Sequence, residues 1–568
     1  MTAPTAALPE LTRRQKVATM VAALLGLLLA ALDGTIVATA GPWIQADLHI
    51  DPGLYVWITT AYLVASTVLV PLWGKLSDLY GRKPILIAGM AIFLLGSVLC
   101  GVAQSTLQLV LFRALQGVGS ASLFTNAFAV VADLFPPAQR SKYQGLFGAV
   151  FGLSSVVGPL VGGFLTQHLS WHWVFFVNLP VGAVAIGFAL ANMPMLRRPR
   201  TGPVRLDIAG SIALVVGMVP LLLALSLGHG AHAQASAGWA WQSKEIIGLF
   251  TIAILGTAAF VVIERRVAEP ILDFSLFRNK TFAIGNLAAF TTGLAFLGAI
   301  VFLPLFMVNV VGLSATDAGL TSMPLTLGLV AANITSGQIV SRVGRYKPII
   351  LIALVVQIIA YLIVGFTLST TSTQAGVSAK MVLVGMGLGP CIPLFTLAIQ
   401  NAVELRQIGV ATATATFSRQ MGATIGIAIV ATVFASTLAN RMHHYLDTPA
   451  GTPAVAVAPA PTEAAPAGEG AAPSARFDAK AIKARINAEF DRKEAGASPA
   501  VVAELEHGRV AALAGVDHTA DGIKHAFTDA NQTIYRLCAL FAALALLVTL
   551  ALPGLPLRKT AGAPPPME

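Results

Sequence analysis

Long stretches of apolar residues recur along nearly the whole chain and are separated by short polar segments. Many of them reach the ~20 residues that a helix needs to cross a bilayer. Because lipid offers no water to backbone N–H and C=O groups, such stretches must be helical. The pattern predicts fourteen spans. They cover residues 17–40, 54–73, 84–103, 107–132, 143–166, 173–194, 207–228, 245–263, 282–306, 318–340, 348–368, 379–400, 408–435 and 531–552.

The composition excludes an ordinary soluble protein. Hydrophobic residues make up 56% of the 568 residues and charged residues only 11%, which is too little charge to cover a soluble surface. The apolar stretch from Val17 to Ala40 is too long for the core of a signal peptide, so we expect it to remain as a span. The predicted fold class is an all-α integral membrane protein.

Positive charge follows the predicted topology. The net charge is +10, but no segment is both basic and soluble enough to bind nucleic acid, so we exclude that function. This pattern of lysine and arginine in alternate short loops predicts a multi-pass protein of the cytoplasmic (inner) membrane with both termini in the cytoplasm. The basic clusters lie at residues 13–16, 75–83, 140–142, 197–205, 265–280, 342–347, 406 and 558–559.

The sequence offers no chemistry for an enzyme. The three cysteines, Cys100, Cys391 and Cys538, lie inside apolar stretches, which predicts reduced thiols and no disulfide framework. No nucleophile–base pair, metal-ligand cluster or nucleotide-binding loop is present. We therefore expect no metal site, no cofactor and no enzymatic activity.

One predicted outside segment, residues 441–530, differs from the other loops. Residues 448–475 are rich in Pro, Ala and Gly, which is typical of a flexible linker. Residues 476–512 are charged and carry apolar residues near helical spacing, with an interruption at Ser498-Pro499. We expect either two short external helices that contact an envelope partner protein or a solvated spacer. The apolar positions are Phe477, Ile482, Ile486 and Phe490.

The chain contains an internal repeat. Residues 74–84 and 337–348 share a pattern of Gly, Arg, Lys and Pro, and Ser341 stands where the first copy has Asp78. Two related halves are what a transporter that rocks about a central site requires. We therefore divide the chain into a first half, an inserted two-helix hairpin, five helices of a second half, the outside segment, and a last span with its tail. These parts are residues 1–195, 196–281, 282–440, 441–530 and 531–568.

The first copy resembles the signature loop of the major facilitator superfamily, Gly-x-Leu-Ala/Ser-Asp-x-x-Gly-Arg-Lys-x-x-Leu. The match runs from Gly74 to Leu86. It implies two pseudo-symmetric six-helix bundles, here with an inserted hairpin, that work by alternating access. It also implies that this loop latches the two halves in the outward-open state. The residues of the conformational switch would be Gly74, Asp78, Gly81, Arg82 and Lys83.

Further segments resemble the fourteen-span drug:proton antiporter branch of that family. They are Leu32–Val37, Arg113–Gly119, Trp171–Gly182, Arg419–Gly422 and the span-five antiporter motif of Gly158, Pro159, Gly162 and Gly163. Four positions depart from the branch pattern, since Ala38 replaces Asn, Gly41 replaces Leu, Ser154 replaces Gly and His172 replaces Arg. The resemblance implies exchange of protons for small lipophilic molecules, driven by the proton gradient and without a cofactor.

Asp33 is the only acidic residue well inside a predicted span. It lies roughly 24 Å from the cytoplasmic end of its span at ~1.5 Å per residue, and Arg113 lies at a similar depth in span four. Burial favours a protonated carboxyl group, whereas a nearby arginine favours the carboxylate. We expect Asp33 to carry the proton and Arg113 to tune it. The alternative is a static ion pair that fixes helix packing.

Four other polar residues in spans are candidates for a central cavity, although hydrogen bonds between helices are the commoner use of such amides. They are Gln116, Asn126, Asn286 and Arg419. Arg419 would equally serve to seal a helix contact. The predicted function is secondary active efflux of small lipophilic molecules against protons. The alternative is export of an endogenous lipid or metabolite together with an envelope partner.

Overall fold

The structure is a computed structural model of the chain. It describes residues 11–50, 52–195, 206–229, 239–267, 269–313, 321, 323–404, 407–446, 479–494 and 499–558. The predicted linker at 448–475 and Phe477 lie outside the described residues.

The first half is a bundle of long helices in which α4 and α2 pack on α5, and α1 packs on α6. Its core contains large side chains such as Leu27, Met90, Phe93, Leu123 and Phe147. The helices are α1 (Arg13–Asp47), α2 (Pro52–Val68), α3 (Val70–Tyr80), α4 (Arg82–Gly101), α5 (Thr106–Leu134), α6 (Pro137–His168), α7 (Trp173–Phe176) and α8 (Asn178–Asn192).

The inserted hairpin consists of α9 (Ile208–Leu227) and α10 (Lys244–Glu264), joined near a short parallel pair of strands, β1 (Gly228–His229) and β2 (Trp239–Ala240). Small residues allow the two helices to approach closely, because a Cβ atom on Gly256 would lie 2.6 Å from the backbone nitrogen of Gly217. α9 packs on α2 of the first half and on α17 of the second half. The hairpin is therefore attached where the two halves meet.

The second half repeats the arrangement, with α14 and α15 packed on α16, and α11 packed on α17. Its last helix, α19, packs on α15, α17 and α11. The elements are η1 (Phe274–Arg278), α11 (Lys280–Val301), α12 (Leu303–Phe306), η2 (Met307–Val311), α14 (Met323–Val343), α15 (Lys347–Thr367), α16 (Gln374–Asn401), α17 (Ile408–Leu446), α18 (Ala479–Glu494) and α19 (Pro499–Leu550).

Most of the predicted spans correspond to helices. Within the described residues, twelve helices are long and apolar enough to cross a membrane, and the pair α2 and α3, bent by 44°, makes thirteen. The predicted span at 282–306 is the one outside this set. There the chain forms α11 and then the short α12, which has Pro304 in its first turn. α11 alone has 22 residues and covers most of the predicted span.

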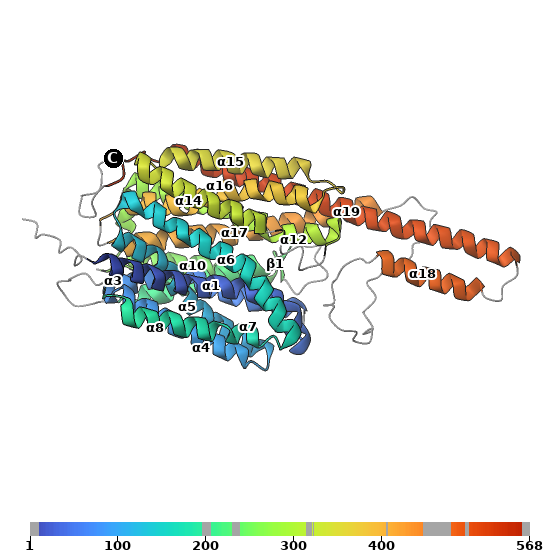
Figure 1. Cartoon of the computed structure of the whole chain (residues 1–568), viewed down its shortest axis with the longest axis horizontal. Coiled ribbons are helices and arrows are strands. Elements are labelled where there is room, and N and C mark those ends of the chain that lie inside the picture. The colour runs from blue at the N-terminus through green and yellow to red at the C-terminus, as the bar shows by residue number, and fades with distance from the viewer. Residues whose placement is uncertain are drawn as a thin grey trace, which may run out of the picture.

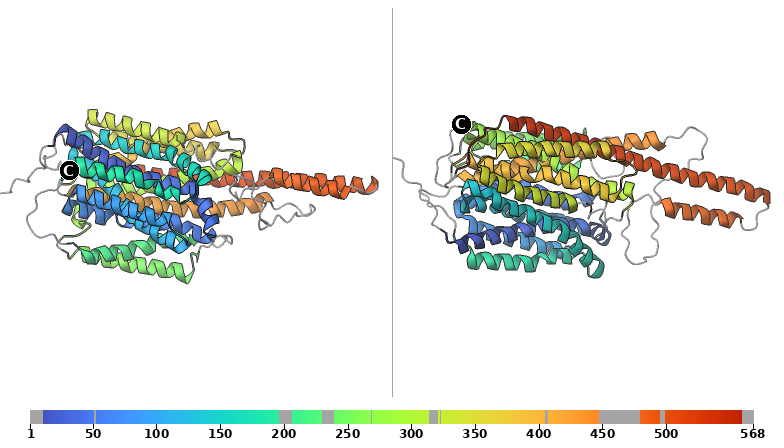
Figure 2. Two further views of the ribbon diagram at one scale, coloured as in Figure 1. Left: turned by 60° about the horizontal axis from the view of Figure 1, so that its bottom comes forward. Right: turned by 45° about the horizontal axis from the view of Figure 1, so that its top comes forward.

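The helices run roughly side by side, and α1 begins at the same end of the bundle at which α19 ends (Figure 1). We call this the terminal end. α18 and α19 project beyond the opposite end, as two further views confirm (Figure 2). We call this second end the projecting end.

The projecting segment differs from the two short helices expected from the sequence. A break does occur before Pro499, but α19 then runs without interruption to Leu550. Its 52 residues correspond to about 78 Å at 1.5 Å per residue, more than twice the ~30 Å of a bilayer core. The predicted boundary between residues 530 and 531 therefore falls inside one helix.

α18 packs antiparallel against the first part of α19. Lys483 Nζ donates to Asp517 Oδ2 at 2.6 Å, and Arg509 Nη1 lies 2.9 Å from Asp491 Oδ1. The predicted apolar positions Ile482, Ile486 and Phe490 are half-buried. The cover that this apolar stripe needs is thus supplied at least in part by α19 itself.

Deleting residues 479–520 and joining the ends by a flexible Gly/Ser linker should leave the membrane bundle folded. The reason is that the contact between Tyr445 Oη and Asp529 Oδ2, at 3.1 Å, and the buried part of α19 after it are retained. Membrane insertion, gel filtration and the melting temperature of the purified variant measure this. A control deletion of 479–535, which also removes buried Ile534 and Tyr535, should lower the melting temperature. Aggregation of the shorter deletion would show that the projection is needed for folding.

Candidate functional site

Asp33 is fully buried in α1, and three side chains donate hydrogen bonds to its carboxylate. Arg113 Nη1 donates to Oδ2 at 2.6 Å, and Gln116 Nε2 donates to Oδ1 at 2.7 Å. Asn178 Nδ2 donates to Oδ1 at 3.2 Å. Arg113 and Gln116 are three residues apart on α5 and therefore share one face of that helix. The structure thus brings together the two residues that the sequence suggested as a pair.

Arg113 is held on its other sides as well. Its guanidinium lies over the Tyr62 ring, 4.2 Å from the ring centroid, and Nη1 also donates to Gln116 Oε1 at 2.7 Å. Glycines allow the neighbouring helices to come this close. A Cβ atom on Gly117 would lie 2.5 Å from Tyr62 O, and one on Gly96 would lie 2.7 Å from Gln116 N. The ion pair therefore depends on close packing of α2 and α4 against α5.

Asn178 belongs to this site, although the sequence analysis did not select it. Its Nδ2 also donates to Ser97 Oγ at 3.0 Å, and Ser97 Oγ donates to Phe175 O at 2.8 Å. Its Oδ1 is buried and has no hydrogen-bond partner among the described residues. The sequence did contain one indication of Asn178, since it is the Asn of the Trp171–Gly182 segment. That segment does not show how deeply the residue lies in the bundle.

At the terminal end, the loop between α3 and α4 connects the two halves. Asp78 Oδ2 accepts a hydrogen bond from the backbone N–H of Val410, in the first turn of α17, at 3.1 Å. Such N–H groups have no partner within their own helix and attract negative charge. Arg82 lies 2.8 Å from Asp78 and 2.6 Å from Asp133. Asp78 is therefore held by its own half while it binds the other.

The backbone of this loop also brings the halves together. Gly81 has a φ of 96°, a conformation that side chains disfavour, and it separates α3 from α4. A Cβ atom on Gly74 would lie only 2.4 Å from the Cβ atom of Ala413 on α17. Lys83 Nζ turns the other way and donates to Leu190 O of α8 at 2.8 Å.

Other polar residues link helices at this level. Arg140 Nη2 donates to Ala132 O at 2.9 Å, and its Nη1 lies 3.4 Å from Gln400 Oε1 on α16. Asn126, expected near a cavity, accepts a hydrogen bond from Ser77 Oγ beside the loop. Asn286 Oδ1 accepts one from Ser418 Oγ at 3.3 Å, between α11 and α17. Both amides thus serve contacts between helices.

Comparison with known proteins agrees with this architecture. Residues 23–427 match the family described as Major Facilitator Superfamily, which is well over half of the chain. The chain belongs to the major facilitator superfamily. It is a transporter of this family rather than an enzyme, and its relatives include multidrug efflux proteins.

Two relatives come from Bacillus subtilis (strain 168). The multidrug transporter protein MdtP is 39% identical over 428 residues, which cover 75% of this chain and 77% of MdtP. Multidrug resistance protein 3 is 39% identical over 420 residues, which cover 74% and 80%. The proton:xylose symporter XylE is similar in structure, with a TM-score of 0.54 and 14% identity over 76% of this chain and 90% of XylE. That last similarity shows the fold alone.

The span-five motif of this transporter packs against the helix that carries Asp33. Cβ atoms on Gly158 and Gly162 would lie 2.0 and 2.2 Å from the hydroxyl oxygens of Thr35 and Thr39 on α1. Thr35 Oγ1 also donates to Ser154 O at 2.9 Å. Pro159 lies inside the same helix, α6. A Cβ atom on Gly163, by contrast, would meet nothing within 4 Å.

Arg419 lies on α17 and is separate from the Asp33 site. Its side chain is half-buried, and its Cζ lies 5.9 Å from the centroid of the Phe128 ring on α5. The residue therefore reaches from the second half toward the first.

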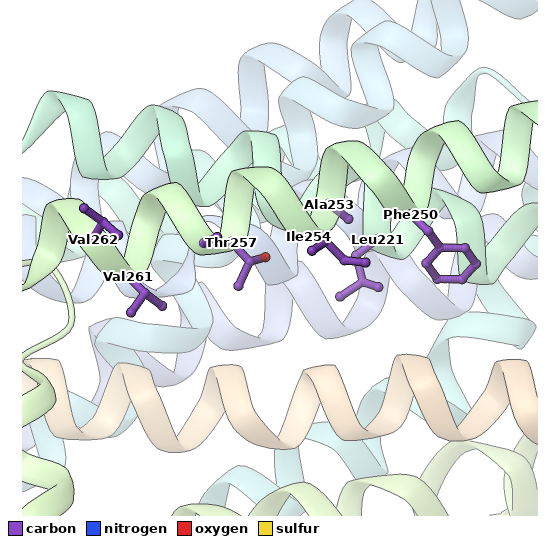
Figure 3. Close-up of a pocket in the computed structure, with 8 residues that line it drawn as sticks. Leu221, Phe250, Ala253, Ile254, Thr257, Val261 and Val262 are labelled. Atoms are coloured by element: carbon purple, nitrogen blue, oxygen red, sulfur yellow. The ribbon is translucent and has the colours of Figure 1, made fainter.

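A cavity of about 550 Å³ lies on the inserted hairpin (Figure 3). Apart from Thr257, all of its lining residues are apolar; they are Leu221, Phe250, Ala253, Ile254, Ala258, Val261 and Val262. It contains no charged group and none of the predicted site residues. In the part of the chain that the structure describes, no three His, Cys, Asp or Glu side chains form a group that could hold a metal ion.

Replacing Gly74 by Ala should separate the halves at the terminal end. The new methyl group would meet the Cβ atom of Ala413 at 2.4 Å, and neither atom can rotate away. Spin labels at the exposed positions Tyr80 and Val343 would report the change as a longer component in the distance distribution from double electron–electron resonance.

The matched control for that experiment is Gly163→Ala, since a Cβ atom there meets nothing within 4 Å. Its distance distribution should equal that of the unmutated protein. An unchanged distribution in Gly74→Ala would contradict the role of this contact in closing the terminal end.

Proposed function

We propose that this transporter exports small lipophilic molecules in exchange for protons, and that Asp33 carries the proton. The observation that supports this most is the buried carboxylate itself. Among the described helices from α1 to α17 it is the only acidic group away from a helix end, and acidic groups at such depth are costly unless they serve transport. The relatives named for multidrug transport and resistance support efflux of drug-like molecules.

Protonation changes the balance of charge at the site. When Asp33 is ionised, Arg113 neutralises it at 2.6 Å. When Asp33 takes up a proton, the attraction is lost and the arginine charge has to find another partner in a region of low dielectric constant. After rotation of its amide, Asn178 Oδ1 can accept the new hydrogen bond from the protonated carboxyl group. The two protonation states therefore favour different positions of α1 relative to α5.

The contacts of α1 provide a route to the second half. α1 touches α6 through Thr35 and Gly158. α6 in turn touches α14, where Ser155 Oγ lies 3.1 Å from Thr326 Oγ1. A shift of α1 on proton uptake would thus alter the contact between the halves, which is what alternating access about a midplane site requires.

The topology completes the proposal. The basic residues of the alternate short loops, at 75–83, 140–142, 265–280 and 342–347, lie at the terminal end, which supports a cytoplasmic location for that end and for both termini. If both termini lie on one side, the number of spans must be even. The thirteen spans counted above and α11 would together make fourteen. The hydrogen bond from Val410 N–H to Asp78 supports assigning this arrangement to a state that is closed toward the cytoplasm and that the latch of Asp78 and Arg82 stabilises.

Replacing Asp33 by Asn should abolish efflux driven by a pH gradient while the protein still folds. Asparagine keeps the shape and can accept hydrogen bonds, but it cannot bind and release a proton at Oδ. The measurement is substrate transport in proteoliposomes with an imposed pH gradient, where the rate should fall to that without a gradient. Passive equilibration down a substrate gradient should persist.

The control is Asp47→Asn on the same helix. Asp47 Oδ2 accepts a hydrogen bond from Trp171 Nε1 at 2.8 Å, and the amide oxygen of asparagine can do the same. Its gradient-driven rate should match that of the unmutated transporter. Gradient-driven efflux at the normal rate in Asp33→Asn would reject the proposal.

A second candidate function is export of an endogenous lipid or metabolite with an envelope partner. It is favoured by the projection of α18 and α19, which lies beyond residues 23–427, the part that matches the family. Transport by the purified chain alone in proteoliposomes separates the two. Efflux that requires an added envelope extract would favour this second function over the first.

A further inference from the structure

Arg419 is a charge inside the membrane without a counter-ion. It follows Ile408, the start of α17, by eleven residues, or about 16 Å at 1.5 Å per residue, which is close to the middle of a ~30 Å core. Among the described residues its guanidinium donates no hydrogen bond and forms no ion pair. An arginine at this depth normally pairs with an acid or lines a polar path, because its isolated charge is costly.

Four acids of the bundle have partners other than Arg419. Asp33 is bound by Arg113, Gln116 and Asn178. The acids at the ends of the described spans are also engaged. Asp78 and Asp133 bind Arg82, and Glu264 accepts from the N–H groups of Ile271 and Leu272. None of these acids therefore supplies a counter-charge to Arg419, which forms no ion pair among the described residues.

The surroundings of Arg419 suit an aromatic acid. The Phe128 ring of the first half faces the guanidinium at 5.9 Å, and it is held edge-on by Phe147 at 4.6 Å. The neighbouring Gln420 has a buried Oε1 without a partner among the described residues, which can accept from a hydroxyl group. A cation and an aromatic ring thus meet between the two halves, and a hydrogen-bond acceptor lies one residue further along α17.

We propose that Arg419 binds the acidic group of the transported substrate, and that the transporter prefers lipophilic aromatic anions, such as carboxylates and phenolates, over lipophilic cations. The anion supplies the missing counter-charge, and its aromatic skeleton lies beside the guanidinium at the edge of the Phe128 contact. This rests on the proposed efflux function and adds the charge of the substrate to it. A site of this kind repels cations, since an unpaired positive charge in a medium of low dielectric constant acts over several ångströms.

Two dyes with the same xanthene skeleton and opposite charge test the proposal. Binding of fluorescein, an anion, and rhodamine 6G, a cation, to the full purified chain in nanodiscs is followed by fluorescence anisotropy without a pH gradient. Fluorescein should bind the tighter of the two. Arg419→Gln should weaken fluorescein binding at least about tenfold and leave rhodamine 6G binding equal or stronger. Arg419→Lys, which keeps the charge, should retain most of the fluorescein affinity.

Arg342→Gln is the control, because it removes one positive charge from an exposed position at the end of α14. It should leave both affinities unchanged. Equal fluorescein binding in Arg419→Gln and the unmutated chain, or a preference for rhodamine 6G, would overturn the proposal. Loss of fluorescein on exchange of sodium gluconate for sodium chloride would assign the site to an inorganic anion and would also overturn it. Arg419-dependent binding of fluorescein without export of any dye from vesicles would sustain the binding site and reject the efflux function.

Discussion

The first half of the transporter is organised around one buried ion pair, Asp33 and Arg113. Each of these charges loses its hydration in the bundle, at a cost of several kcal/mol per ion unless partners replace the water. The carboxylate consequently needs Gln116 and Asn178 in addition to Arg113, and the guanidinium needs the Tyr62 ring. These partners come from α2, α5 and α8, so the pair fixes where those helices stand relative to α1.

The pair in turn requires small residues. In a membrane the hydrophobic effect does not drive helices together, and close backbone packing takes its place. Gly96 and Gly117 let α4 and α2 reach α5, and Gly158 lets α6 reach α1 two residues from Asp33. A side chain at any of these positions would move the polar groups beyond hydrogen-bond distance. The glycine-rich motifs of the sequence are thus the steric condition for burying the charges.

Hydropathy predicted fourteen spans, of which thirteen match helices long and apolar enough to cross a membrane. The depth argument paired Asp33 with Arg113. Both predictions depend only on distance along a helix. Asn178 escaped prediction since its role depends on how α8 is rotated against α1, which no local pattern records. The same holds for Val410, whose N–H group binds Asp78 only because α3 reaches the start of α17. The continuity of α19 was missed because its first part is polar and its last part apolar. One helix crosses both environments, and a search for apolar stretches divides it.

The two repeats also differ in a way that bears on the switch. Gly81 and Gly344 both have positive φ, 96° and 73°, and each donates to the carbonyl four residues earlier. The backbone turn is therefore common to both loops. Ser341, in the place of Asp78, donates instead to Gln338 O of its own helix at 2.8 Å. Because an uncharged hydroxyl attracts helix N–H groups less than a carboxylate does, the charged contact between the halves rests on the first repeat. If the carboxylate of Asp78 were lost, the second loop would therefore have no equivalent charge to replace it.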